Sequence, residues 1–448
     1  MVVDLNVVGA KTFYEGVLVQ CGISVDEGKI EKVGKESSLP KSDRTLDVRG
    51  MLVLPGLIDV HVHLRDMELS YKEDFHSGTA SAAAGGFTTV VDMPNTSPPT
   101  DSSERLRIKI EKAQRRILTN VGFYGALHDK EGLVEEMVKE GAIGFKLNLL
   151  DPLADLDVYN VDALTKALRA VRRGNSFVVV HAEDLRTVRE ITDRYRRLED
   201  FSLRAFLKAH SSEAEQSAIR RVLELQNRTG ARLHIAHVTT SSSIDFISKA
   251  KSGGGKVTCE VTPHHLMLTE EDLLRIGGKA LTVPPLRSKA DRARLWKALI
   301  DGDVDVVASD HAPHALSEKS DRDVWAVKPG IPGLETTLSL MMTRFHGGDL
   351  TIERMVRLLA EGPAKVLELK DAGRIEKGFR ADLVVVDVKK RYKIDSSTFQ
   401  SKAHYSPFDG LEVRGKPVKT LVNGIFVVDE GEIVAGDCVG EVLGRATS

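Results

Sequence analysis

Side chains that can bind a metal ion recur where short β-like runs of the sequence end. Four are histidines, one is a lysine and one is an aspartate: His61, His63, Lys146, His181, His237 and Asp310. Imidazole and carboxylate groups are typical ligands of Zn²⁺. Because four histidines and one aspartate are more than a single tetrahedral zinc ion needs, they favour a two-metal centre.

Lys146 is the exception in this set, because a free ammonium group repels a metal ion. One interpretation is that it forms a salt bridge or has a solvated tip. The other is that it is carbamylated by CO₂ and becomes an anionic ligand that bridges two metals. The residue alone leaves both interpretations open.

The runs that carry these residues alternate with longer amphipathic segments, such as Leu164–Arg173 and Glu213–Thr229. We predict eight strands: Leu57–Val62, Thr88–Met93, Val121–Ala126, Ala142–Leu147, Phe177–Val180, Arg232–Ala236, Lys256–Glu260 and Val304–Ser309. This alternation predicts an α/β fold, a (β/α)₈ TIM-like barrel. Since the carboxyl ends of barrel strands form one rim, the six side chains are expected to meet there.

A single histidine at a strand end is commonly a hydrogen-bonded structural residue, so each needs weighing. His61 and His63 are two residues apart and therefore point to the same side of a strand. This pair alone is a weak signal; with His181, His237 and Asp310 on the same rim it is strong. His234, three residues before His237, is expected to face outward or to be structural.

Short β-like runs with glycine turns also occur at both ends of the chain. Examples are Val17–Gln20 and Lys29–Val33 near the start, and Asp382–Asp387 and Ile425–Val428 near the end. We predict that the two terminal segments pair into one small β-sandwich. The predicted divisions are residues 1–54 and 377–448 for the sandwich and 55–376 for the barrel.

Charge and composition exclude several classes of protein. The 448 residues include 63 Lys+Arg and 65 Asp+Glu, a formal net charge of −2. This balance predicts no nucleic-acid partner, because polyanion binders usually have a basic excess. No apolar run approaches the roughly 18 residues that cross a bilayer, and no secretory signal begins the chain. With three widely spaced cysteines, these features predict a cytoplasmic protein without a membrane partner.

Several longer motifs resemble those of the cyclic amidohydrolases in the amidohydrolase superfamily, and within them the dihydroorotases. They are Pro55–Arg65, Asp92–Thr96, Gly144–Lys146, His181–Asp184, Thr262–His265, Ala308–His314 and Gly330–Thr336. The resemblance implies a barrel flanked by a β-sandwich and two Zn²⁺ ions per subunit. One zinc would be held by His61, His63 and Asp310 and the other by His181 and His237, with carboxylated Lys146 and a hydroxide as bridges.

The resemblance also implies roles beyond metal binding. Asp310 would move the proton from the attacking water to the leaving ring nitrogen. Arg65, Asn95 and His314 would hold a substrate carboxylate, and backbone groups at Pro329 and Gly330 would contact the ring. From the residues alone, Arg65 could instead be a solvent-facing charge and Asn95 a turn residue after Pro94.

The activity implied is reversible, metal-dependent hydrolysis of the cyclic amide of dihydroorotate, the third step of pyrimidine synthesis. Alternatives are an allantoinase, a dihydropyrimidinase or hydantoinase, and a non-catalytic scaffold. Two departures bear on the substrate: Asp66 is followed by Met67 and Glu68 instead of Pro-Gly, and Val283 replaces a common asparagine. The resemblance further implies a homodimer or homotetramer, with possible association with aspartate transcarbamoylase.

Overall fold

A ring of eight parallel strands forms the centre of the computed structural model, which describes residues 2–130, 132–320, 322–436 and 438–444. Each strand lies beside the next one in the chain. The strands are β8 (Leu57–Val62), β9 (Phe87–Asp92), β10 (Asn120–Ala126), β11 (Gly144–Asn148), β12 (Phe177–His181), β13 (Arg232–Ile235), β14 (Val257–Val261) and β15 (Val306–Val307). The predicted (β/α)₈ barrel is confirmed, with strand ends shifted by a few residues.

The barrel closes at the rim where the strands end. Val62 and His311 form a parallel bridge, and the His63 N–H donates to the carbonyl of His311 at 2.8 Å. This contact joins the segment after β15 to the end of β8. It therefore brings Asp310 next to His61, although the two are far apart in sequence.

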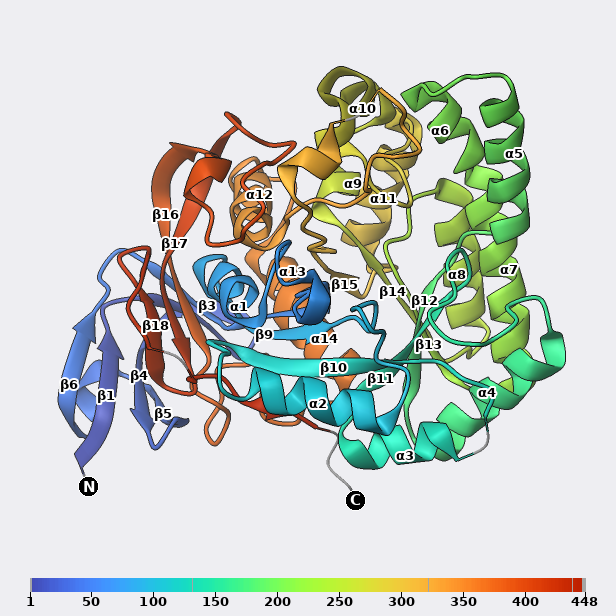
Figure 1. Cartoon of the computed structure of the whole chain (residues 1–448). Coiled ribbons are helices and arrows are strands. Elements are labelled where there is room, and N and C mark those ends of the chain that lie inside the picture. The colour runs from blue at the N-terminus through green and yellow to red at the C-terminus, as the bar shows by residue number, and fades with distance from the viewer. Residues whose placement is uncertain (1, 131, 321, 437, 445–448) are drawn as a thin grey trace.

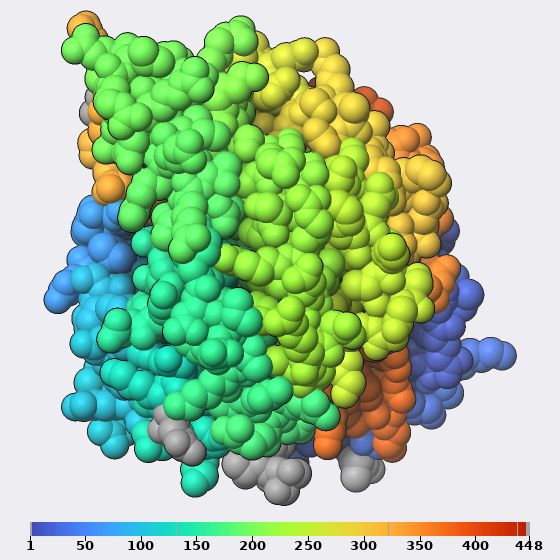
Figure 2. Space-filling view, turned by 90° about the vertical axis from the view of Figure 1, so that its right-hand side faces the viewer, coloured from blue at the N-terminus to red at the C-terminus, as the bar shows by residue number. Residues whose placement is uncertain are grey.

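Helices cover the outside of the barrel (Figure 1). They are α1 (Phe75–Ala84), α2 (Ser103–Ala113), α3 (Leu133–Glu140), α4 (Val161–Arg173), α5 (Leu185–Arg197), α6 (Leu203–Ala209), α7 (Ser212–Thr229), α8 (Ser241–Ser252), α9 (Pro263–Met267), α10 (Glu270–Ile276), α11 (Lys289–Asp301), α12 (Leu334–His346), α13 (Ile352–Val356) and α14 (Gly362–Leu367). Figure 2, seen from the side of α5, α7 and α8, shows a continuous cover of these segments in green to yellow-green. None of the described helices combines the length and apolar character that crossing a bilayer requires.

Helix α4 illustrates why these segments are helical and where they pack. Its apolar residues Leu164, Leu168 and Val171 are buried and recur at the spacing of one helix face. The side chain of Asn160 accepts hydrogen bonds from two backbone N–H groups of the first turn, which caps the helix. The charged residues are left on the outer face.

Strands from both ends of the chain share one sheet beside the barrel. Its seven strands, in spatial order, are β19 (Glu432–Ile433), β18 (Ile425–Asp429), β17 (Glu412–Val422), β16 (Leu383–Lys393), β7 (Leu52–Pro55), β2 (Lys11–Tyr14) and β3 (Val17–Gln20). A second sheet contains β5 (Lys29–Gly34), β4 (Gly22–Asp26), β1 (Val2–Val8) and β6 (Lys41–Asp47). Figure 1 shows the blue and red strands side by side.

The predicted pairing of head and tail is present at β7 and β16, where Val53 lies opposite Val385. Both side chains belong to a buried cluster with Leu5 and Ile23 of the second sheet. The two sheets thus form a sandwich with its own core. The exact divisions of the chain at residues 54/55 and 376/377 stay a prediction.

One element of the tail leaves the sandwich and was not predicted. Strand β20 (Val442–Leu443) runs parallel to the first residues of β10, where Val121 lies opposite Val442. Strand β11 pairs with β10 only from Tyr124 onward, so β20 fills the gap at the start of β10. Leu443 is buried among apolar side chains of the barrel interior.

A buried ion pair joins helix α2 to strand β9. Lys109 Nζ lies 2.6 Å from Asp92 Oδ2, and each side chain is only 1% exposed. The other oxygen of Asp92 accepts the N–H of Leu64 at 2.7 Å. The pair therefore also fixes the turn that follows His63.

We expect Lys109→Met to lower the free energy of unfolding by about 3–5 kcal/mol, because it leaves the Asp92 carboxylate buried without a counter-ion. Denaturant or thermal unfolding measures this loss. Adding Asp92→Asn should recover part of it, since the double variant has no buried charge. Equal stability of Lys109→Met and the parent would contradict the role of the pair.

Candidate active site

A cavity of about 480 Å³ lies at the mouth of the barrel, where the strands end. Every site residue predicted from the sequence lines it: His61, His63, Arg65, Asn95, Lys146, His181, His237, Asp310, His314, Pro329 and Gly330. They come from the ends of separate strands and from the loops that follow. The predicted side chains therefore meet at one rim, as expected. The role of each one depends on its distances and hydrogen bonds, which follow.

His61, His63 and Asp310 form a compact cluster whose ligand atoms all lie within 4.8 Å of one another. Asp310 Oδ1 is 3.3 Å from His61 Nε2 and 3.2 Å from His63 Nε2. Two imidazole nitrogens and one carboxylate oxygen thus face a common point. This is a donor set that suits Zn²⁺.

His181 and His237 form a second pair on the other side of the cavity. Nδ1 of His181 lies 3.0 Å from Nε2 of His237, and both side chains are buried. The rings of His61 and His237 are 5.3 Å apart, so the pair adjoins the first cluster. Five predicted ligands therefore surround one small volume.

The nitrogens that point away from this volume have hydrogen-bond acceptors. His61 Nδ1 donates to Glu260 at 2.5 Å, and His181 Nε2 donates to Glu183 at 2.8 Å. His63 Nδ1 donates to the side-chain oxygen of Asn95 at 2.7 Å. Each of these bonds leaves the inward nitrogen unprotonated, which is how second-shell groups orient histidine ligands of metals.

Glu260 connects three histidines beneath the cavity. Besides His61, it accepts from His234 Nε2 at 3.0 Å and from the backbone N–H of His237 at 3.1 Å. His234 is therefore structural, as expected. It is not on the outer face, because it bonds the same carboxylate as His61.

The electrostatics of the cluster favour the neutral forms of His63 and His237 and the charged form of Asp310. Burial lowers the pKa of His63 to about 4 and the pKa of His237 well below its usual range. Burial alone would raise the pKa of Asp310, but His61 and His63 bring it well below its usual value. Neutral imidazoles and ionised carboxylates are the forms that bind metals.

Lys146 points into the same cavity and is 5% exposed, so it has no solvated tip. Within the described residues no carboxylate forms an ion pair with its amine. Burial lowers its pKa to about 8, despite the opposing effect of Glu260 and Asp310. A buried amine without a partner, beside two groups of metal-ligand type, fits a residue that is modified or ligated.

The residues present therefore fit a metal centre. Among the described residues, the inward nitrogens of these histidines contact only each other and the Asp310 carboxylate, and no other backbone or side-chain N–H or O–H donates to their lone pairs. His237 Nδ1 is a buried polar atom without a hydrogen-bond partner in the described chain. Burying several polar atoms without hydrogen-bond partners costs free energy. A cation bound to these nitrogens and oxygens would remove that cost.

A cationic group forms the rim of the cavity next to His63. Arg65 is 7% exposed, and its Nε donates to the carbonyl of Pro313 at 3.3 Å. Lys72 Nζ donates to His314 Nδ1 at 3.0 Å, so the proton of His314 is on Nε2, which donates to the carbonyl of Pro329 at 3.0 Å. Burial and the cations Arg65 and Lys72 lower the pKa of His314 and keep it neutral.

The turn after Arg65 has an unusual backbone. Arg65, Asp66 and Met67 have φ values of 57°, 48° and 52°, which non-glycine residues rarely adopt. Asp66 is buried, and its carboxylate is 2.6 Å from Lys112 Nζ and 2.9 Å from Arg116 Nη1. These ion pairs hold the turn that replaces the Pro-Gly of the related motif.

The remaining predicted substrate residues also have defined positions. Asn95 lines the cavity and orients His63, so it is more than a turn residue. Gly330 has a φ of 137°, and a Cβ there would meet the carbonyl oxygen of Ala312 at 2.4 Å. Val283 lines the same cavity, so its replacement of asparagine alters the wall that substrate would meet.

Several site residues were not predicted from the sequence. Glu260 is the last residue of the predicted strand Lys256–Glu260. Its position at a strand end, like that of the histidines, could have identified it. Glu183, two residues after His181, has a similar position and also accepts from His210 at 3.0 Å. Lys72 lies in a loop with no periodic pattern, so no comparable signal marked it.

A β/α barrel with this cluster at its mouth is the architecture of a metal-dependent hydrolase. The family described as Amidohydrolase family matches residues 52–427. Because this match spans most of the sequence, the chain belongs to that family.

Individual relatives match over nearly the whole chain. A dihydroorotase from Methanothermobacter thermautotrophicus is 36% identical, with 93% of this chain and 92% of the relative covered. An L-hydantoinase from Paenarthrobacter aurescens is 33% identical, with 96% and 95% covered. Among solved structures, an L-hydantoinase (dihydropyrimidinase) from Arthrobacter aurescens has a TM-score of 0.94 at 32% identity, covering 99% of this chain and 100% of that one.

We expect Glu260→Gln to weaken zinc binding by roughly 10–100-fold, because an amide cannot accept from both His61 and His234 as the carboxylate does. Competition with a chromophoric chelator measures the affinity. Asp382→Asn is the matched control, since Asp382 is an equally buried carboxylate in contact with Asn120 and Asn423, away from the cavity. An unchanged affinity in Glu260→Gln would contradict this role.

Proposed function

We propose that the protein is a dihydroorotase that reversibly hydrolyses the cyclic amide of (S)-dihydroorotate to N-carbamoyl-L-aspartate, a step of de novo pyrimidine synthesis. The dihydroorotase relatives, matched over most of the chain, support this choice. The eleven predicted site residues all line the cavity and would provide both a metal-binding set and a substrate-binding set.

The observation that carries the proposal is the buried Arg65 guanidinium. Among the described residues no acidic side chain pairs with it, although it borders the cavity. The neighbouring His314 Nε2 lies 3.2 Å away and is itself a donor, so it does not neutralise the arginine. A buried, unpaired guanidinium favours an anionic ligand, and it can bind a carboxylate with two parallel hydrogen bonds.

We assign the metal positions to two Zn²⁺ ions. His61, His63 and Asp310 would hold one, His181 and His237 the other, and carboxylated Lys146 would bridge them. Bound zinc would supply a hydroxide at neutral pH and polarise the amide carbonyl.

The chain's own groups then orient the substrate and move the proton. Arg65, Asn95 and His314 would hold the ring carboxylate, while the backbone at Pro329 and Gly330 would contact the ring. The ionised Asp310 carboxylate accepts the proton of the attacking water and returns it to the leaving ring nitrogen. In the reverse direction the same groups close N-carbamoyl-L-aspartate with loss of water.

A second candidate is hydrolysis of a cyclic amide without a carboxylate, as in a hydantoinase or dihydropyrimidinase. The similarity to the L-hydantoinase structure favours it, and Val283 removes a polar group from the cavity wall. Assays of the purified enzyme on dihydroorotate, allantoin, dihydrouracil and hydantoin side by side discriminate the two. Preference for the uncharged rings would overturn the dihydroorotase assignment.

We expect Arg65→Met to lower kcat/KM for dihydroorotate by roughly a hundredfold or more, because a buried charged hydrogen-bonded pair is worth about 2–5 kcal/mol. Steady-state kinetics of the Arg65→Met variant and of the parent measure the change. Any slow turnover of dihydrouracil, which has no carboxylate, is the internal control and should change little. Retention of dihydroorotate turnover within a few-fold would contradict the carboxylate role of Arg65.

We expect Lys146 to carry a carbamate, because its buried amine has no anionic partner in the described chain. Zinc-free protein is reconstituted with Zn²⁺ in the presence of ¹³C-bicarbonate. It should then show a carbamate signal by NMR and bind about two zinc ions per chain. Lys146→Gln should lose the signal and most of the activity. The exposed control Lys390→Gln should keep both, and a signal that persists in Lys146→Gln would contradict the assignment.

A non-catalytic scaffold on this fold is disfavoured by the intact set of ligand-type residues. Less than one zinc per chain after careful reconstitution would favour it instead. The small-molecule substrate fits the size of the cavity. The homo-oligomeric state, association with aspartate transcarbamoylase and cytoplasmic location remain predictions from the sequence.

A further inference from the structure

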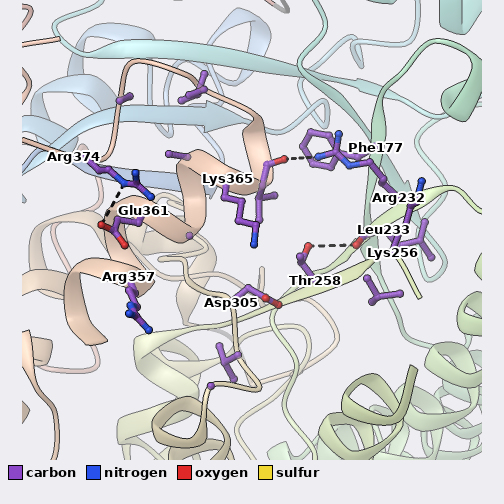
Figure 3. Close-up of a pocket in the computed structure, with 18 of the residues that line it drawn as sticks. Phe177, Arg232, Leu233, Lys256, Thr258, Asp305, Arg357, Glu361, Lys365 and Arg374 are labelled. Atoms are coloured by element: carbon purple, nitrogen blue, oxygen red, sulfur yellow. Dashed lines mark hydrogen bonds and ion pairs between the residues drawn. The ribbon is translucent and has the colours of Figure 1, made fainter. Parts of the chain in front are cut away.

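A second cleft, of about 850 Å³, lies at the end of the barrel opposite the candidate active site. Phe177 and Arg232, which begin β12 and β13, line it together with Lys256 and Asp305, which precede β14 and β15. The starts of parallel barrel strands form the rim opposite their carboxyl ends. The segment from Arg354 to Arg374 forms the other wall (Figure 3).

Positive charge is concentrated in this cleft. Two acidic side chains line it, Asp305 and Glu361, against seven basic ones: Arg232, Lys256, Arg354, Arg357, Lys365, Lys370 and Arg374. The whole chain, in contrast, has a formal net charge of −2. The excess is therefore local to the cleft and not a property of the whole chain.

Ion pairs neutralise only part of this charge. The pairs are Arg232 with Glu368, Arg357 with Glu353 at 2.8 Å, Arg374 with Glu361 at 3.5 Å, and Asp305 with Lys251. Arg354 donates to the backbone carbonyls of Leu299 at 2.6 Å and Val304 at 2.7 Å, and no acidic side chain pairs with it in the part of the chain that the structure describes. For Lys256, Lys365 and Lys370 no acidic partner is present among the residues that the structure describes. Four cations in one cleft are thus left without counter-ions.

The wall formed by the segment from Arg354 to Arg374 carries three of these four cations, Arg354, Lys365 and Lys370, and contains an unusual turn. Residues Arg357–Glu361 form a π-helical turn that leads into α14. Such turns are rare and occur often at functional sites. At Gly362, a Cβ atom would meet the carbonyl oxygens of Asp305 at 2.3 Å and Arg357 at 2.5 Å. The glycine therefore allows this wall of the cleft to pack directly against the segment before β15.

Size and charge together indicate the kind of ligand. The volume is within the range of roughly 300–1,000 Å³ that is typical of small-molecule sites. In Figure 3, Lys365 extends from α14 toward the middle of the cleft, between Arg357 on one side and Arg232 on the other. Arginine and lysine in such an arrangement bind phosphate oxygens through charge-assisted hydrogen bonds.

We propose that this cleft binds a small molecule that carries a chain of phosphate groups, such as a nucleoside triphosphate or an inorganic oligophosphate. Lys256, Lys365 and Lys370 contact the phosphates, and Arg354 adds a fixed positive charge beside them. The site is separate from the candidate active site and does not depend on the reaction catalysed there.

Equilibrium dialysis of the metal-loaded full-length protein with ATP tests the proposal, in excess Mg²⁺ and about 50 mM salt, where exposed charges are weakly screened. We expect saturable binding of about one ATP per chain. Displacement by inorganic tripolyphosphate but not by adenosine would show that the phosphates are recognised. If adenosine displaces ATP as well as tripolyphosphate does, the phosphate-binding proposal is overturned.

The variant Lys256→Gln/Lys365→Gln/Lys370→Gln should bind ATP roughly a hundredfold more weakly, because three charge-assisted contacts are removed. These lysines are exposed, so its melting temperature and turnover should match the parent. The matched control Lys389→Gln/Lys390→Gln/Lys393→Gln removes the same charge from exposed positions of β16 and should bind ATP like the parent.

Other results would also overturn the proposal. The first is the absence of saturable ATP and tripolyphosphate binding, and the second is equal binding by the two triple variants. The third is binding of single-stranded RNA by the protein without binding of ATP, which would assign the cleft to a different ligand. A change of oligomeric state in the cleft variant without ATP binding would likewise assign the surface to contact between copies of the chain.

Discussion

A carboxylate buried in an apolar barrel must find hydrogen-bond donors, and Glu260 meets this requirement with histidines from two separate parts of the barrel. Its oxygens accept from His61 on β8 and from His234 and the backbone of His237 on and after β13. The His61 ring and the end of β13 are consequently fixed in position by the protein alone. The geometry of the candidate metal site is thus preorganised by the same interaction that satisfies a buried charge.

Charge is divided across the cavity in a way that suits the proposed substrate. The floor contains imidazoles and carboxylates, whereas the basic side chains Arg65, Lys72 and Lys319 lie at the rim, where Lys72 pairs with Glu318 at 2.9 Å. Burial lowers the pKa of Lys319 to about 7, and its Nζ donates to three carbonyls, including that of Gly330 at 2.8 Å. Lys319 thereby holds the loop at Gly330, which would contact the ring in the proposed function, and the unpaired Arg65 would favour an anionic substrate group beside it.

The parts of this structure that could be predicted from the sequence are those encoded by local pattern. Strand and helix alternation identified the barrel, and the barrel in turn implied that distant strand ends such as His61 and Asp310 would meet. The outward position considered for His234 was wrong for a local reason. Strand β13 ends at Ile235, and His237 has a φ of 33°, so counting alternate faces back from His237 fails. Lys72 and the oligophosphate cleft depend on tertiary packing, and no periodicity marks them.

The short strand β20 has a consequence for how the molecule is made. Asn120, at the start of β10, accepts the backbone N–H of Glu441, which is 321 positions later in the chain. Until the ribosome has added residues 441–443, the start of β10 has no strand on the side of β11. The other strands of the barrel have been synthesised by then. A nascent chain in which β10 has formed therefore keeps an open strand edge until residues 441–443 are added, and an open edge can pair with another chain.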